Sequence, residues 1–340
     1  MIQTAIRSTI NLRSLILSLW LPLAILVAGY ITASHYAAQQ KAEQRQRIQQ
    51  AVMQRLQLIT DGVREKVTLY QYGLRGTRGA VMTISPERFS YQDMQTYTRS
   101  RDYKLEFPGA RGFGLIRPIT PEQKENFLQR MAQERPDYSF NIRQLQPHQH
   151  SLFVIQYIEP EARNSEAVGL DIGSEPMRRK AALDAALNND IRLTAPITLV
   201  QANQKTQQGF LILMPVYLSS TPAAEPEQRL RQLYGWSYAP ILINEVLNTL
   251  SGLQPDVILR ISDISNEQAV AFFFRGDTSD QANEYQQMQN IDLFGRKWQL
   301  SLIPTHNFIT ALHLPSTKAY FREILGWSIL LALGVYLLQL

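Results

Sequence analysis

Two uncharged, apolar segments, one near each end of the chain, restrict the fold more than any other feature of this 340-residue sequence. The first covers 14–33, about 20 residues, which is the length that a helix needs to cross the hydrocarbon core of a bilayer. The second covers 324–340 and lies at the short limit of a membrane span. Arg7 and Arg13 precede the first segment, and basic flanking residues favour the cytoplasmic side. We therefore predict two membrane crossings, with 1–34 as a cytoplasmic N-terminus and first transmembrane helix and about 35–320 outside.

A cleaved signal peptide is the alternative for the first segment, because small residues stand at its end, Ala33 and Ser34. The apolar region of a signal peptide usually spans roughly 7–15 residues, and this one is longer, so we favour an uncleaved anchor. The second segment ends without the basic anchor expected on the cytoplasmic side. We therefore expect 305–340 to be a connector and a truncated second transmembrane helix, with a cytoplasmic module following in a longer parent protein.

Composition and motifs argue against several classes of function. The absence of cysteine removes disulfides, thiolate catalysis, cysteine-ligated zinc and iron–sulfur clusters. The net charge is +5, but Lys and Arg alternate with Asp, Glu and Gln, which indicates a solvated surface and no nucleic-acid partner. The G-x-S-x-G, Walker and dinucleotide motifs are missing from the sequence.

Histidines give no clear site either. His148 and His150 have no third metal ligand at a useful spacing, so we interpret QPHQHS as a surface loop. We assign no catalytic residue, no metal site and no cofactor. A Ser-His-Asp hydrolase stays open as an alternative, because the members of such a triad need not be adjacent in sequence.

A long stalk helix is predicted over 35–85, continuous with the first apolar segment. Residues 37–64 lack proline and are rich in Gln, Glu, Lys, Arg and Ala, which favour helix. Apolar residues recur in an eleven-residue pattern that keeps them on one side of the helix: Ile48, Val52, Leu56, Ile59, Val63, Val67, Tyr70 and Leu74. This stripe packs either on the chain's own domain or on a second subunit. We favour a stalk whose distal part packs on the domain, within a homodimer.

After Pro86 the pattern changes to mixed helix and strand. Short helices and alternating strands fill 86–220, and the turn-rich sequence SSTPAAEPE at 219–227 is the clearest internal boundary. A smaller helix-and-strand set repeats the layout over 221–304. The fold class is therefore α+β, with two lobes built on antiparallel sheets. On the predicted helix after Ser174, Arg178 and Arg179 are interpreted as a solvated face.

Several segments, in this order between the two apolar ends, carry a family pattern: GLRGTRGAV at 73–81, FPGARGFGLIRPI at 107–119, residues 157–183 around GLDIGSEP, TAPITL at 194–199 and GFLILMPVY at 209–217. This series resembles the CHASE sensory domain of bacterial histidine kinases, nucleotide cyclases and plant cytokinin receptors. The resemblance implies a stalk helix and two PAS-like lobes, with 86–220 as the membrane-distal, ligand-binding lobe and 221–304 as the proximal one. It also implies a bacterial inner-membrane location with 35–320 in the periplasm.

The resemblance also points to one polar site residue. Cytokinin receptors use an aspartate in the segment that matches 168–174 to hydrogen-bond the adenine of the hormone, and the matching residue here is Asp171. Its position just before a helix allows a second interpretation, because a carboxylate there orders the turn and satisfies backbone N–H groups. We leave the two roles open.

Apolar candidates for the ligand pocket follow from their positions. Phe153, Ile155 and Tyr157 alternate along one predicted strand and should share a face, while Leu193, Phe210 and Met214 lie on strands expected to neighbour it. Small-molecule sites are mostly apolar with a few placed polar groups, so such a cluster could line one. The alternative for each is ordinary core packing.

The resulting hypothesis is a membrane-anchored sensor region and no enzyme within these 340 residues. A small molecule of unknown identity, with a purine among the candidates, would shift the balance between two states of the lobe. The lipid bilayer and a second subunit are the other expected partners. Output would come from a missing diguanylate cyclase, phosphodiesterase or histidine kinase module. The alternative is a membrane-tethered periplasmic binding or interaction protein without an output module.

Overall fold

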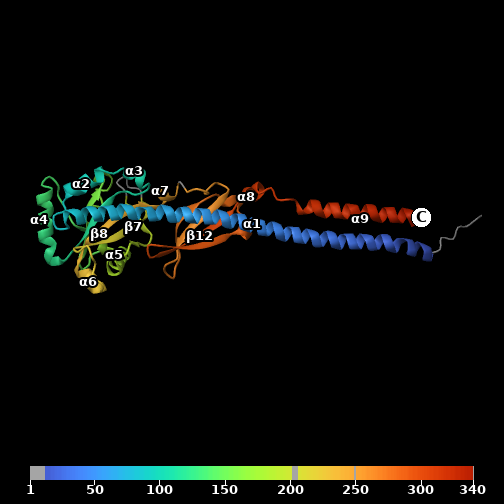
Figure 1. The fold of residues 1–340 in the computed structure, drawn as a ribbon, viewed down its shortest axis with the longest axis horizontal. Coiled ribbons are helices and arrows are strands. Elements are labelled where there is room, and N and C mark those ends of the chain that lie inside the picture. Colours follow the sequence, from blue (N-terminus) through green and yellow to red (C-terminus); the bar gives the residue numbers. More distant parts are fainter. Residues whose placement is uncertain (1–11, 201–205, 249, 340) are drawn as a thin grey trace, which may run out of the picture.

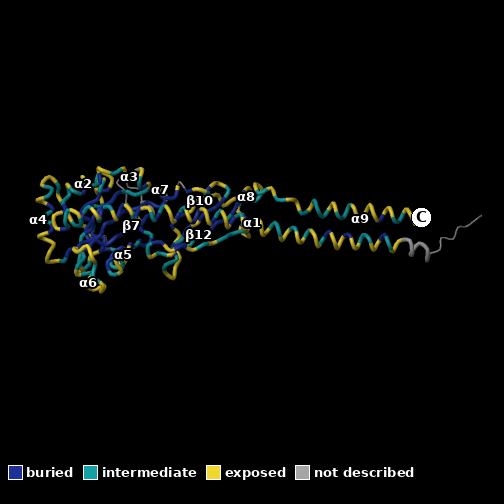
Figure 2. Tube along the Cα trace, in the orientation of Figure 1, coloured by how far each residue is buried: buried dark blue, intermediate teal, exposed yellow. Residues whose placement is uncertain are grey.

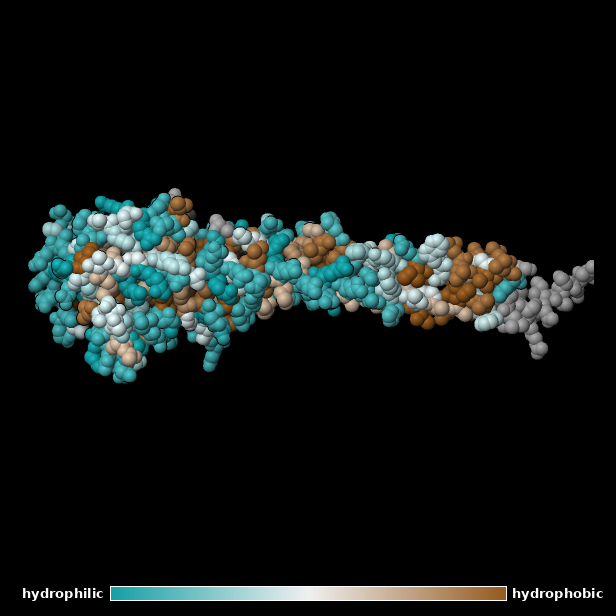
Figure 3. Space-filling view, viewed as in Figure 1, coloured by the Kyte–Doolittle hydropathy of each residue, from teal (hydrophilic) through white to brown (hydrophobic). Residues whose placement is uncertain are grey.

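The computed structural model describes residues 12–200, 206–248 and 250–339, so the prediction for Arg7 and the rest of 1–11 lies outside the described residues. Helix α1 (Leu12–Ile84) extends along the molecule, and α9 (Thr317–Gln339) lies beside its beginning (Figure 1). Both contain stretches long and apolar enough to cross a membrane. Their surface is the apolar end in Figure 3. The first predicted span and the predicted stalk are thus parts of one helix.

Close side-chain contacts join α1 and α9. The rings of Tyr30 and Phe321 lie 6.1 Å apart, and those of Tyr36 and Tyr320 lie 5.7 Å apart, both edge to face. A Cβ atom at Gly29 would collide with Ser328, so glycine allows the two helices to approach here. The first and last helices of the chain therefore form one antiparallel pair.

Farther along α1, the predicted apolar stripe is buried against the chain's own sheets. Every member from Ile48 to Leu74 is at most 5% exposed, and α1 contacts β7, β8, β11 and β12. Figure 2 shows this change from the partly exposed paired helices to the buried interior. The interpretation of packing on the chain's own domain is correct for this stripe, which is therefore not available to a second subunit.

The first lobe is built on a largely antiparallel sheet of order β2-β4-β3-β1-β8-β7-β5, with β6 also paired to β7. Only the short β2–β4 pair among the described strands is parallel. The strands are β1 (Phe113–Ile119), β2 (Arg143–Gln144), β3 (Leu152–Glu159), β4 (Leu170–Asp171), β5 (Arg192–Leu193), β6 (Ile197–Val200), β7 (Thr206–Tyr217) and β8 (Leu233–Leu242). The helices of this lobe are α2 (Tyr91–Arg99), α3 (Tyr103–Glu106), η1 (Pro121–Gln123), α4 (Lys124–Glu134), η2 (Glu161–Arg163), η3 (Ile172–Ser174), α5 (Pro176–Asn188) and α6 (Pro226–Arg231).

The second lobe has an antiparallel sheet of order β10-β9-β12-β11. Its strands are β9 (Val257–Asp263), β10 (Val270–Arg275), β11 (Gln287–Leu293) and β12 (Arg296–Pro304). Helix α7 (Ile243–Leu247) leads into it, η4 (Thr278–Asp280) and η5 (Asn283–Tyr285) connect its strands, and α8 (His306–Ala311) follows. The expected α+β fold with a long first helix, antiparallel sheets and a final apolar helix is confirmed.

The predicted lobe boundary at residue 220 is wrong. Strand β8 pairs with both β1 and β7, so it is a central strand of the first sheet. The turn-rich segment 219–227 is a connection within the first lobe, and the chain enters the second lobe only after Leu242. A turn signal shows where a strand ends, but the partner of the next strand depends on distant residues.

The first sheet separates two apolar cores. One contains the stripe of α1, parts of α2 and α4 and the interior of the second lobe. The other lies between the sheet and α5, whose contacting face is alanine-rich: Ala181, Ala182, Ala185 and Ala186. Small side chains let α5 approach the sheet closely, which places its N-terminal end beside β3 and β4.

Candidate ligand-binding site

Asp171 is the last residue of β4 and precedes η3, and its side chain is fully buried. Its Oδ1 accepts the backbone N–H of Phe153 at 2.7 Å and that of Gly173 at 2.9 Å. These bonds hold the first residues of β3 and the turn before α5 together. The turn-ordering role proposed from the sequence is therefore present.

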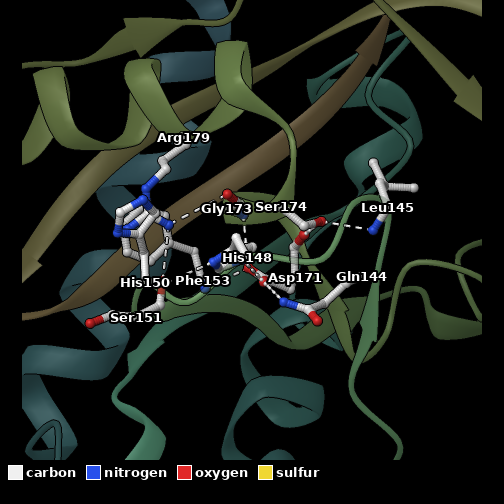
Figure 4. A network of polar contacts seen from close by, with 10 residues as sticks. All are labelled: Gln144, Leu145, His148, His150, Ser151, Phe153, Asp171, Gly173, Ser174 and Arg179. Carbon is white, nitrogen blue, oxygen red and sulfur yellow. Dashed lines mark hydrogen bonds and ion pairs between the residues drawn. The ribbon is translucent and has the colours of Figure 1, made fainter.

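The second oxygen of Asp171 has a different kind of partner. Its Oδ2 lies 2.6 Å from His148 Nε2 and 3.3 Å from Gln144 Nε2 (Figure 4). Both side chains belong to the segment 144–151, which is mostly exposed, and both reach inward to Asp171. The same segment is tied down once more, because Ser174 Oγ accepts the N–H of Leu145 at 2.8 Å. The buried carboxylate is thus covered by a surface loop.

An aromatic and cationic group lies next to this carboxylate. The guanidinium carbon of Arg179 lies 4.5 Å from the ring centre of Phe153, and the ring of Trp236 packs at a tilt against the same ring at 4.7 Å. Arg179 Nη1 also donates to the carbonyl of Ser151 at 2.9 Å. Burial lowers the pKa of Arg179, and the negative charge of Asp171 opposes that change. Phe153 therefore forms one wall of the site, with a cation across its face.

The interpretation of Arg178 and Arg179 as a solvated helix face is wrong. Arg178 is only 8% exposed, and burial lowers the pKa of its guanidinium. The polar face of α5 is turned toward the lobe because the alanine residues beside it leave room for long side chains. A charge run in sequence does not show which way the helix is rotated.

The structure gathers only part of the predicted pocket. Phe153 and Ile155 lie with Asp171 on the α5 side of the sheet, whereas Tyr157 lies on the α1 side. The cause is a bulge: Leu115 pairs with Tyr157 and Ile116 pairs with Ile155, so the residue between them is unpaired. Because side chains alternate along a strand, one extra residue reverses the faces that follow. The expectation of one shared face is therefore wrong for Tyr157.

The remaining candidates are also far from Asp171 in the sheet. Leu193 on β5 and Phe210 and Met214 on β7 belong to the core on the α1 side, and β1 and β8 separate their strands from β3. The ring of Phe210 lies edge to face with Phe272 at 5.0 Å and tilted against Trp298 at 5.1 Å, which joins the two lobes. They were expected on strands next to β3, and that placement is wrong. Their packing is that of core residues.

His148 is the site residue that sequence reasoning missed. It was considered only as one half of a metal pair with His150, whose ring stacks on it at 6.0 Å. Its contact with Asp171 spans 23 residues and depends on how a loop closes over the sheet. In the sequence, His148 only follows a proline in a polar segment, and this local pattern does not show how the loop closes.

Comparison with protein families identifies the family to which the chain belongs. The model of the CHASE domain matches residues 87–274, which is more than half of the chain. The chain therefore belongs to the CHASE domain family, a family of sensory domains. No curated protein sequence gives a significant match.

Solved structures with a similar fold include an extracellular ligand-binding receptor from Desulfohalobium retbaense, at 11% identity and a TM-score of 0.46 over 74% of this chain. The match spans 40% of that receptor's length. The periplasmic sensory domain of the Campylobacter jejuni chemoreceptor Tlp1 has 9% identity and a TM-score of 0.47, over 74% of this chain and 93% of that domain.

Proposed function

We propose that this chain is the sensor region of a two-pass inner-membrane receptor, which binds a small ligand beside Asp171 in the membrane-distal lobe. The proposal rests on a difference between the two oxygens of the Asp171 carboxylate, which have different kinds of hydrogen-bond partner. Backbone N–H groups hold Oδ1, whereas Oδ2 is bound by the side chains of His148, in an exposed loop, and of Gln144, in edge strand β2. The contact with His148 can be exchanged without opening the sheet.

In this proposal a ligand takes the place of His148. A donor group such as a ring N–H would hydrogen-bond Oδ2, and a flat body would lie near Phe153 and Trp236. A purine has both features. Ligand binding would move the loop 145–151 outward, and the preference of the ligand for the open loop would supply the bias between two states.

Transmission follows from α1, which runs without interruption from the distal lobe into the predicted first span. An α-helix is a stiff rod that rises about 1.5 Å per residue. Helix α9 packs against the beginning of α1. A change in the distal lobe would therefore shift α1 relative to α9. The output module would be a cytoplasmic cyclase, phosphodiesterase or histidine kinase, and sequencing the reading frame beyond codon 340 tests this part.

The proposed homodimer requires a face of α1 other than the buried stripe. The opposite face carries exposed apolar residues within the sensor region: Leu58 at 51%, Leu69 at 36% and Tyr72 at 60% exposure. Positions 58 and 69 are eleven residues apart and positions 69 and 72 are three apart, so these side chains lie on one face of the helix. We place the dimer contact on this outward face.

A thermal-shift screen of the full chain in detergent, against adenine, substituted purines and other small metabolites, tests the ligand site. A compound that stabilises the wild type should lose its effect in Asp171→Asn, because the acceptor at Oδ2 is replaced. His148→Ala should instead bind it more tightly, since the competing side chain is removed. The matched control is Asp263→Asn, which alters a buried carboxylate of the second lobe that pairs with Arg296 at 2.8 Å. Equal stabilisation of Asp171→Asn and the wild type would refute the assignment.

A further inference from the structure

A cavity lies at the membrane-distal end of the first sheet, where β1 ends and β8 begins. Its volume is about 580 Å³, within the size range of small-molecule sites. Helices α4 and α6 contribute to its walls, and α4 marks the far tip of the molecule in Figure 1. The cavity meets the Asp171 network only near Ser151, and its arginines are not part of that network.

The charge of this cavity is positive. Arg117, Arg130 and Arg231 line it, and its lining contains no acidic residue. Arg130 is neutralised by Glu134 at 2.7 Å, just outside the lining. Within the described parts of the chain, neither Arg117 nor Arg231 forms an ion pair. The cavity thus retains two uncompensated positive charges.

Arg117 is the unusual member of the set. Its guanidinium carbon lies 3.7 Å from the ring centre of Tyr234, and its Nε is buried without a hydrogen-bond partner among the described residues. Burial lowers the pKa of Arg117, and the nearby charge of Arg130 adds to this effect. A buried guanidinium without a counter-charge is costly, so its natural complement is an anion.

Tyr234 carries a second buried polar group at the same place. Its side chain is 4% exposed, and its hydroxyl has no hydrogen-bond partner within the described residues. The hydroxyl lies close enough to Arg117 and Arg130 for both to influence its ionisation. Both unpaired atoms are buried behind the cavity wall, whereas the terminal Nη atoms of Arg117 are not among these buried atoms and are its donors toward the cavity.

We propose that this distal cavity is a second ligand site, which binds a small organic anion through a carboxylate or phosphate group. The guanidinium of Arg117 holds the anionic group, because it presents several N–H donors in a plane. Arg231, which is exposed, attracts the anion at the mouth. The body of the ligand contacts the apolar part of the wall: Pro118, Ile119, Phe127, Leu230 and Leu233.

Isothermal titration of the full chain in detergent tests the site with phenyl phosphate and benzoate as anionic probes and benzamide as the neutral probe. At least one anionic probe should bind, and benzamide should not. Arg117→Met should weaken binding at least about tenfold, because a charge-assisted hydrogen bond is lost. It should also raise the melting temperature of the free protein, since a buried uncompensated charge is removed. Arg231→Met should weaken binding with an unchanged melting temperature.

Arg260→Met is the matched control, because Arg260 is an exposed arginine on the second sheet. It should bind the anionic probe as the wild type does. The proposal is overturned if neither anion binds, if benzamide binds equally well, or if Arg117→Met and Arg231→Met retain wild-type affinity. An equal loss in Arg260→Met would also overturn it, because only a general charge effect would remain. The Asp171→Asn variant should keep the anion site, which separates this result from the proposed ligand site.

Discussion

At the level of single residues, Asp171 combines a structural and a proposed binding role in the two oxygens of one carboxylate. Oδ1 is fixed by Phe153 and Gly173, and Oδ2 faces His148 and Gln144. The sequence placed both roles on this residue but gave no basis for dividing them. The division matters because it lets the loop move while the turn before α5 stays intact.

The structural role of Asp171, which binds two backbone N–H groups through Oδ1, predicts different effects for two substitutions. Asp171→Ala removes the acceptor of two buried N–H groups, and each unsatisfied group costs about 1–3 kcal/mol. We expect it to lower the free energy of unfolding by about 2–4 kcal/mol. Asp171→Asn retains an acceptor oxygen and should lose less. Urea unfolding followed by circular dichroism measures both, and equal losses would show that the N–H bonds do not matter.

Tyr217 gives a pH-dependent prediction outside the binding sites. Its hydroxyl donates to the carbonyl of Ala186 at 2.6 Å, and burial raises its pKa to about 12. The folded-state pKa lies above the unfolded value near 10, so this contribution to stability is full below pH ~10 and is lost as the pH rises to about 12. Tyr217→Phe should therefore reduce the decline in unfolding free energy over that range. A decline as steep as that of the wild type would contradict this.

At the level of elements, α1 shows why similar glycines in one helix have different uses. A Cβ atom at Gly73 would collide with the ring of Phe113, whereas one at Gly79 would meet nothing within 4 Å. Gly73 therefore sets how closely α1 approaches the start of β1. Gly79 only weakens the helix, because glycine has the larger conformational freedom in the unfolded chain.

These two glycines form a matched pair of predictions. Gly79→Ala should raise the free energy of unfolding by roughly 0.5–1 kcal/mol, because the helix gains a better former. Gly73→Ala should lower it by about 1–2 kcal/mol, because overpacking against Phe113 outweighs that gain. Chemical denaturation of both variants measures the difference. Shifts of the same sign would mean that α1 and β1 adjust without cost.

At the level of the whole molecule, the two apolar helices lie at one end and the proposed ligand sites lie in the lobe at the other. Between these ends, the ring contacts of Phe210 with Phe272 and Trp298 join the two lobes. Helix α1 contacts both lobes and α9. Helix α1 and the packed lobes therefore both connect the first lobe to the predicted membrane region.

The proposed dimer can be tested at this scale by disulfide cross-linking, because the natural sequence contains no cysteine. Leu69→Cys, on the outward face of α1, should form a cross-linked dimer in membranes under mild oxidation. Lys180→Cys is at a more accessible position, because the Lys180 side chain is 75% exposed, but it lies on α5 and should stay monomeric. A dimer from Lys180→Cys alone, or none from Leu69→Cys, would require another interface.

The sequence by itself determined the features that local patterns encode: the apolar end segments, the eleven-residue stripe of α1, the two-sheet α+β class and the turn-ordering position of Asp171. Each depends on residues a few positions apart, or on family segments in order. The tertiary structure alone decided that β8 joins the first sheet, that the bulge turns Tyr157 to the other face and that His148 covers Asp171. The contact between Arg117 and Tyr234 likewise joins distant strands. Strand partners, register and loop closure are set by packing between distant segments, which no local pattern records.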